Sequence, residues 1–230
     1  QTCALPIFFN LIWFCKKVAI PFDVYAFTNE WRRADHDYET GKIIPCDRTS
    51  HFEKKEGLFY VDESFSMMNI LTSKVSQSVL EHQMKNIWRL ASHFSNKYYT
   101  PYTYPNRLCL SGTPLNEALV SLHQILPKFQ KENKLQKVQC IVLTDGEENA
   151  SRGDYSGEPG RIKLAEKIKL QQEVYNWIFY FLGTNIDAIK VGKSYGIDQR
   201  TCINYNNSQN GCTNVMRSAS HALNRVRFAP

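Results

Sequence analysis

Two short stretches of the sequence combine hydroxyl and carboxylate side chains with turns that would expose them. Val138–Asn149 reads VQCIVLTDGEEN, an apolar run with β-branched residues that ends abruptly in polar residues. Such a run is typical of a buried parallel strand, and open α/β sheets place their ligand sites at the C-terminal ends of these strands. We therefore expect Asp145 to leave the sheet in a glycine-containing turn, where its carboxylate can face a cation.

The second stretch, Ser111–Leu115, reads SGTPL and precedes a helical pattern of apolar residues. Pro114 suits the first turn of that helix, and Thr113 stands immediately before it. The Thr113 hydroxyl and the Asp145 carboxylate are hard oxygen ligands, the type that Mg²⁺ prefers. The alternative is structural: Thr113 caps the helix, Asp145 forms a turn, and no metal binds.

Taken in order, SGTPLNEAL and IVLTDGEEN resemble the von Willebrand factor A (VWA) domain family, over roughly Phe9–Ile203. The similarity is greatest to the VWA domains of CobT-type cobalt chelatase subunits and their phage-borne relatives. The resemblance implies a metal-ion-dependent adhesion site (MIDAS), in which Thr113 ligates Mg²⁺ directly and Asp145 acts through a water molecule. The family's other ligands lie in a DxSxS motif after the first strand, and this motif is absent from the sequence.

The resemblance implies an α/β fold, a three-layer sandwich with a mostly parallel central sheet whose first strand is missing here. Length and composition fit one domain of about 200 residues with an insertion. We assign a single VWA-like domain to residues 8–230, with a polar insertion at about 29–56. In the VWA order the missing strand lies between the Ala19–Thr28 and Val138–Leu143 strands. Three arrangements are then expected. The sheet keeps a gap at the position of the missing strand, or Ala19–Thr28 moves to pair with Val138–Leu143. In the third, residues 1–9 enter the sheet as a surrogate strand.

Residues 1–7 stand apart from this pattern. QTCALPI is the translation of CAG ACG TGT GCT CTT CCG ATC, which resembles a common sequencing-library adapter, so we exclude it from fold reasoning. We expect the natural chain to continue upstream into the missing strand and its DxSxS loop. The alternative is that these residues are a true N-terminus.

Hydrophobic periodicity predicts the remaining elements. Helices are expected at residues 9–17, 76–94, 115–126, 161–173, 187–196 and 213–226. Further strands are expected at residues 58–61, 175–182 and 201–205. Phe65–Leu71 is expected to form a short helix or helical turn, and Pro127 with the charged residues after it is expected to end the helix that begins at Leu115.

Composition limits the classes of function. The net charge is +6, but basic residues mostly share helices with acidic ones, so we expect solvated helix faces and no nucleic-acid partner. No apolar run is long enough to span a membrane. The cysteines outside residues 1–7 form no CxxC pair, so we expect no disulfide framework and a cytoplasmic setting. The resemblance to CobT-type proteins and their phage-borne relatives implies that the cell is bacterial or phage-infected.

Two classes of function remain open. We favour a non-enzymatic interaction module, because a MIDAS ion with few anionic ligands stays electrophilic and accepts a carboxylate from a protein ligand. The resemblance to CobT-like proteins also implies an AAA+ ATPase partner. The alternative is a metal-dependent hydrolase or peptidase-like enzyme that uses Asp145, Glu147 and the insertion's histidines, His36 and His51.

Overall fold

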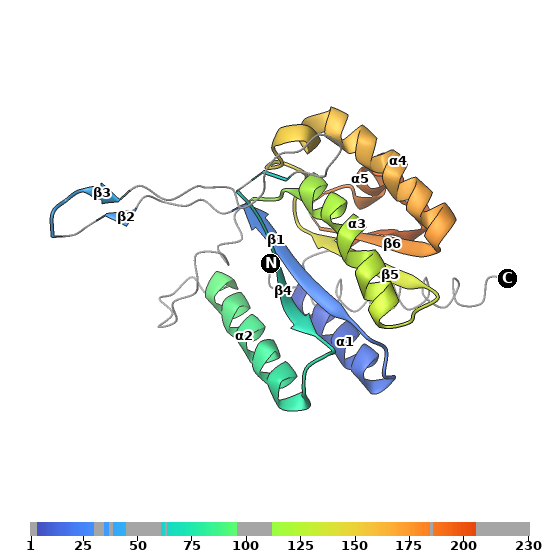
Figure 1. Ribbon diagram of the computed structural model, residues 1–230, viewed down its shortest axis with the longest axis horizontal. Coiled ribbons are helices and arrows are strands. Elements are labelled where there is room, and N and C mark those ends of the chain that lie inside the picture. The colour runs from blue at the N-terminus through green and yellow to red at the C-terminus, as the bar shows by residue number, and fades with distance from the viewer. Residues whose placement is uncertain are drawn as a thin grey trace.

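Helices and strands alternate through most of the computed structural model (Figure 1), which describes residues 4–29, 35–36, 39–44, 61–62, 64–95, 112–184 and 186–205. In chain order the elements are α1 (Ala4–Lys17), β1 (Asp23–Asn29), β2 (Asp35–His36), β3 (Ile43–Ile44), β4 (Phe65–Thr72), α2 (Gln77–Ser95), α3 (Leu115–Glu132), β5 (Val138–Thr144), η2 (Gly153–Tyr155), α4 (Gly157–Tyr175), β6 (Trp177–Gly183), α5 (Ala188–Ser194), η3 (Gln199–Thr201) and β7 (Cys202–Asn204).

The strands β5, β6 and β7 form a parallel sheet in that order. Val138 of β5 lies opposite Trp177 of β6, and Thr144 lies opposite Gly183. The central strand β6 is apolar along its length and buried at nearly every position, as expected of a parallel strand with both faces covered. The prediction of an α/β fold with a parallel sheet is confirmed for this part of the chain.

A second sheet consists of β1 and β4, which pair in antiparallel fashion. Val24 pairs with Leu71 and Tyr25 with Asn69, so Ile70 is one extra residue in β4 and forms a bulge. The prediction of a helical turn at Phe65–Leu71 is wrong. Its apolar residues fit either period over so short a run, and pairing with β1 selects the strand.

Among the described residues the two sheets remain separate. The only ladder partner of β1 is β4, and the only ladder partner of β5 is β6. Of the three expected arrangements, the described strands therefore show the gap: β1 has not moved across to pair with β5. The expectation of a surrogate strand at residues 1–9 is wrong from Ala4 onward, because these residues belong to α1.

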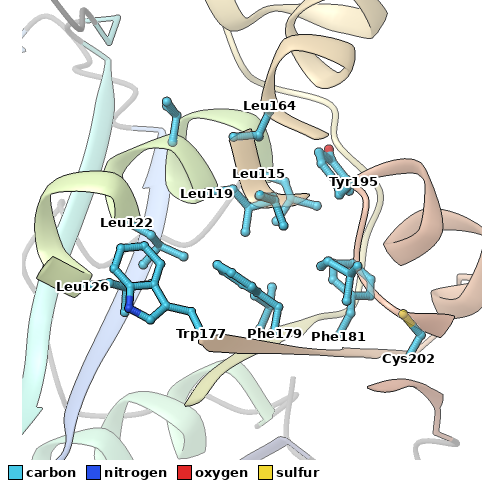
Figure 2. Packing of buried hydrophobic residues seen from close by; sticks show 14 of the residues in the cluster. Leu115, Leu119, Leu122, Leu126, Leu164, Trp177, Phe179, Phe181, Tyr195 and Cys202 are labelled. Carbon is cyan, nitrogen blue, oxygen red and sulfur yellow. The ribbon is translucent and has the colours of Figure 1, made fainter. Parts of the chain in front are cut away.

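Helix α3 covers one face of both sheets (Figures 1 and 2). Its leucines pack against alternate aromatic residues of β6, and Phe27 of β1 and Met67 of β4 pack against the same cluster. Figure 2 shows this packing between the α3 residues Leu115, Leu119, Leu122 and Leu126 and the β6 residues Trp177, Phe179 and Phe181.

Helix α1 performs the same role on the opposite face. Leu11 packs with Tyr180 and Leu182 of β6, whereas the next residue, Ile12, packs with Leu71 of β4 and Leu80 of α2. Two helices, one on each face, therefore contact both sheets and hold them in one body although the strands β1 and β5 do not pair.

Helix α3 also continues further than the sequence suggested. It passes through Pro127 and ends at Glu132, so the expectation that Pro127 ends the helix is wrong. A proline inside a helix removes one backbone hydrogen bond. Tertiary contacts offset this loss: Leu126 is buried in the main core, and the Trp177 indole donates a hydrogen bond to Gln130 Oε1 at 2.8 Å.

The polar insertion is described only in part. Its β2 and β3 segments pair in antiparallel fashion, Asp35 with Ile44 and His36 with Ile43. Most of the predicted insertion at 29–56, the predicted strand residues 58–60 and the predicted helix at 213–226 lie outside the described residues.

The core packing gives a stability prediction. Leu119 is 2% exposed in the cluster between α3 and β6, whereas Leu170 on α4 is 56% exposed. Leu119→Ala leaves a cavity, so we expect it to lower the free energy of unfolding by about 2–5 kcal/mol. The matched change Leu170→Ala should cost less than about 0.5 kcal/mol. Urea unfolding followed by circular dichroism measures both, and equal losses would contradict this packing.

Candidate functional site

The C-terminal ends of β1 and β5 lie at one edge of the domain. Asn29 is the last residue of β1, and its Nδ2 donates a hydrogen bond to the carbonyl of Ala150, at 3.2 Å, in the loop that follows β5. The loops after the two strands are therefore joined. Both strands run toward this edge, so β1 and β5 are parallel to each other although they do not pair.

Thr113 lies against the loop that follows β5. Its amide donates a hydrogen bond to Asn149 Oδ1 at 2.9 Å, and its carbonyl accepts one from the Asn149 amide at 3.3 Å. Thr113 Oγ1 lies 3.3 Å from the position that a Cβ atom on Gly146 would occupy, and Gly146 directly follows Asp145. The structure thus brings together the two loops that carry Thr113 and Asp145.

The Thr113 side chain does not cap α3. The N-cap residue is Pro114, which supplies no side-chain cap hydrogen bond. The helix instead takes acceptors from the β5 loop: the Asn116 amide donates to Glu148 Oε2 at 2.7 Å, and the Glu117 amide donates to Ser151 Oγ at 3.3 Å. The capping alternative for Thr113 is therefore wrong, and its hydroxyl is not used by the helix end.

The turn after β5 is held by Thr144. Its Oγ1 accepts a hydrogen bond from the Gly146 amide at 3.2 Å and donates one to the Gly146 carbonyl at 2.8 Å. These two bonds close a small loop around Asp145. The position of the Asp145 residue is thus fixed from both sides by its neighbours.

Glu148 is the residue that sequence reasoning missed. Its Oε1 accepts hydrogen bonds from the amides of Ala150 and Ser151, at 2.9 and 2.7 Å, and its Oε2 accepts from Ser151 Oγ and the Asn116 amide, both at 2.7 Å. A carboxylate at a helix N-terminus is stabilised by the unpaired amides and by the helix dipole. The run DGEEN does place an acid here, but only the fold shows that it meets α3.

Glu117 is a buried carboxyl group at the same edge. It is 0% exposed, and its Oε1 accepts a hydrogen bond from the Asp62 amide at 3.0 Å. Among the described residues its Oε2 has no partner with normal hydrogen-bond geometry. The pKa of Glu117 is raised to about 7, mainly by burial; the carboxylates of Asp62 and Glu148 add to the rise, and the amides of Asp62 and Arg152 oppose it.

Asn29 presents a second buried acceptor. The residue is 5% exposed, its Nδ2 also donates to Ser64 Oγ at 3.4 Å, and its Oδ1 has no partner among the described residues. Gly112 approaches so closely that a Cβ atom there would lie 2.5 Å from Asn29 Oδ1. Glycine at position 112 is therefore required for the Thr113 loop to pass over the end of β1.

The side chains at this edge carry oxygen atoms of the kind that Mg²⁺ prefers, but too few to complete a coordination shell. Thr113 and Asp145 offer two hard oxygen donors, against the six positions of an octahedral Mg²⁺ shell. Within the described ranges, no group of three or more His, Cys, Asp or Glu residues could hold a metal. The remaining positions would thus need water, a protein ligand or residues beyond those described.

The surroundings include an open depression at the C-terminal ends of β5, β6 and β7, lined in part by Glu147, Asp187 and Asn204. Of the histidines named for a hydrolase, His36 belongs to β2, where only the backbone is described, and His51 lies outside the described residues.

A scan against protein-family models, a search of curated proteins and a search of solved structures each returned no match to this chain. In the part of the chain that the structure describes, no helix is both long and apolar enough to cross a membrane.

The buried Glu117 gives a pH prediction. Its folded-state pKa of about 7 exceeds the ordinary value of 4.5, so the folded protein holds this proton more tightly than the unfolded chain does. The stability associated with protonated Glu117 is fully present below pH 4.5 and is lost as the pH rises to about 7. We expect Glu117→Gln to gain up to about 3 kcal/mol of stability relative to the parent chain between pH 4.5 and 8.

Urea unfolding at a series of pH values measures this difference. The exposed Glu166 on α4 supplies the matched control, and Glu166→Gln should change the free energy of unfolding by less than about 0.5 kcal/mol. A stability difference between Glu117→Gln and the parent that does not change with pH would show that Glu117 ionises as an ordinary exposed acid.

Proposed function

We propose that this chain is a VWA-like, MIDAS-type interaction module that binds a protein ligand through a divalent cation. The observation that supports the proposal is the pair of hydrogen bonds between Thr113 and Asn149, at 2.9 and 3.3 Å. These bonds hold the Thr113 loop against the Asp145 loop, while the hydroxyl of Thr113 is left out of the helix cap. A neutral and an anionic oxygen donor are thereby presented on adjacent loops.

In this proposal Thr113 and Asp145 would hold Mg²⁺, Thr113 through its hydroxyl oxygen and Asp145 through a water molecule. When bound, the ion supplies an electrophilic centre that can accept a carboxylate from a partner. A hydroxyl donates no negative charge, so it leaves the ion more electrophilic than a second carboxylate would. Glu148 stabilises the loop that carries Asp145. Its carboxylate oxygens accept hydrogen bonds from amide and hydroxyl groups of its own loop and of α3, so in this proposal Glu148 is not itself a ligand of the ion.

The ligand proposed for this module is a protein that presents a carboxylate, with an AAA+ ATPase as the working partner, in the manner that the resemblance to CobT-like proteins implies. The proposed role is non-enzymatic. Two acidic side chains line or flank the open depression beside the Asp145 loop, Glu147 and Asp187. A divalent ion at Asp145 would reverse the local sign of charge there, which would allow an acidic partner to approach.

Metal binding tests this proposal. We expect millimolar Mg²⁺ to raise the melting temperature of this chain by only about one degree, because Thr113 and Asp145 supply two of the six positions of an octahedral shell. Thr113→Val and Asp145→Asn should each abolish that rise, since both changes keep the side-chain shape and remove a donor. Differential scanning fluorimetry with and without Mg²⁺ gives the measurement.

The control is Asp154→Asn, which removes a carboxylate from the exposed η2 turn outside these two loops. This variant should keep the Mg²⁺ response of the parent chain. A response that survives both Thr113→Val and Asp145→Asn would contradict the proposed site.

A further inference from the structure

Helix α1 carries aromatic side chains on the side that faces away from the rest of the domain. Its inner side packs against β6, β4 and α2 through Leu11 and Ile12. Its outer side is a stripe of residues three and four positions apart, all of them exposed: Asn10, Trp13, Phe14 and Lys17. The outer stripe of a surface helix normally holds polar or charged side chains, whereas two of these four are aromatic rings.

The apolar surface continues past the end of the helix. The amide of Val18 donates a hydrogen bond to the carbonyl of Phe14 at 3.1 Å, so Val18 lies one helical turn beyond Phe14. Trp13 is 53% exposed, Phe14 49% and Val18 48%. Single exposed apolar side chains are ordinary on protein surfaces, but neighbouring ones with polar residues at their border mark interaction sites. We call Trp13, Phe14 and Val18, together with Lys16 and Lys17, the α1 patch.

The border of the α1 patch is positively charged. Lys16 Nζ lies 5.0 Å from the centroid of the Trp13 ring. The two lysines, Trp13 and Phe14 line an open hollow of about 410 Å³. Residues 4–22 contain no Asp or Glu, and in the part of the chain that the structure describes neither Lys16 nor Lys17 forms an ion pair. The α1 patch therefore combines an apolar hollow with two uncompensated cations.

The α1 patch lies at the end of the domain opposite the candidate metal site. The chain leaves the patch at Val18, enters β1 at Asp23 and reaches the site's edge only at Asn29. Strand β1 has seven residues, and at about 3.3 Å per residue it separates the two ends by about 20 Å. A ligand on the α1 patch would thus leave the Thr113 and Asp145 loops uncovered.

We propose that the α1 patch binds an acidic amphipathic helix of another protein, with apolar side chains in the hollow and carboxylates beside Lys16 and Lys17. The patch lies on a helix and offers no strand edge, so side chains must carry the recognition, as they do when a helix docks by its apolar face. Tryptophan is enriched among the residues that dominate binding energy, and complementary charge selects and orients the partner. This surface is additional to the proposed ion site and does not depend on it.

Charge argues against the occupants that this chain could itself supply. In a contact between two copies through the α1 patch, lysines would face lysines, and such like-charge contacts are unfavourable. Residues 206–230 contain three arginines and no Asp or Glu, so they too would bring positive charge to Lys16 and Lys17. An anionic membrane fits less well than an acidic helix, because basic clusters that bind such membranes have about four to eight Lys or Arg residues.

Fluorescence anisotropy with a labelled peptide tests the proposal, in EDTA so that no divalent ion contributes. The probe is a helical peptide of about four turns, roughly 15 residues, with leucine and phenylalanine along one face and glutamate elsewhere. A matched peptide has lysine in place of every glutamate. At low salt the acidic peptide should bind about tenfold more tightly than the basic one. Trp13→Ser should weaken its binding by about tenfold, and Lys16→Glu combined with Lys17→Glu should reverse the preference between the two peptides.

Helix α2 supplies matched controls. Trp88 is 61% exposed, and the exposed residues Lys85 and Arg89 lie near it on the same helix. Trp88→Ser removes an equally exposed ring, and Lys85→Glu combined with Arg89→Glu changes the net charge of the protein by the same amount as the α1 charge reversal. Both controls should keep the affinity of the parent chain for the acidic peptide within about twofold, because neither touches the α1 patch.

Equal affinity for the acidic and basic peptides would overturn the proposal, and so would α2 variants that lose as much affinity as the α1 variants. Sedimentation of the parent chain with phosphatidylserine-containing vesicles, or as a dimer, would assign the α1 patch to a membrane or to a second copy if Trp13→Ser abolished it, and would overturn the proposal as well. All of these measurements are made without Mg²⁺, so failure here is distinct from failure of the proposed function.

Discussion

The carboxylate of Glu148 fastens the loop after β5 to the N-terminus of α3, and the geometry of the candidate site depends on this contact. Its two oxygens accept hydrogen bonds from Ala150, Ser151 and Asn116. Helix N-termini leave backbone amides unpaired, and an anion placed there gains from both the hydrogen bonds and the dipole. Because Glu148 performs the capping, the Thr113 side chain before the helix is available for another role, and the Asp145 loop is held beside it.

This contact has a wider consequence because α3 is also the helix that packs on both sheets. Its leucine face joins the β6 aromatics to Phe27 of β1. The position of the Thr113 loop is therefore set by the core, through α3, and by the β5 loop, through Glu148 and Asn149.

The sequence was sufficient for elements with strong local patterns. The run at Val138–Asn149 predicted a parallel strand that ends in a polar loop, and the structure has β5 there, parallel to β6. Phe65–Leu71 was mispredicted because a short apolar run fits a helix or a strand, and only pairing with β1 distinguishes them. Helix α3 continues beyond Pro127 because its C-terminal end packs on the core. This is a tertiary effect, and local helix propensity does not predict it.

The residues of the candidate site likewise divide into those that the sequence predicts and those that only the fold identifies. Thr113 and Asp145 could be named from their motifs, and the structure places their loops together. Glu148 and Glu117 could not be named, because their roles depend on where α3 meets the β5 loop and on how deeply the helix start is buried. A carboxylate looks alike in sequence whether it caps a neighbouring helix, lies buried with an unpaired oxygen, or faces solvent.

The central claim is that the Thr113 and Asp145 loops together hold a divalent cation. A crystal structure of the protein grown with Mn²⁺ tests it most directly, because Mn²⁺ takes the same hard oxygen ligands as Mg²⁺ and gives an anomalous signal. We expect one strong anomalous peak about 2.0–2.3 Å from Thr113 Oγ1, with a water between the ion and Asp145. An ordered site in which both loops keep their present hydrogen bonds and no anomalous peak lies near Thr113 would contradict the claim.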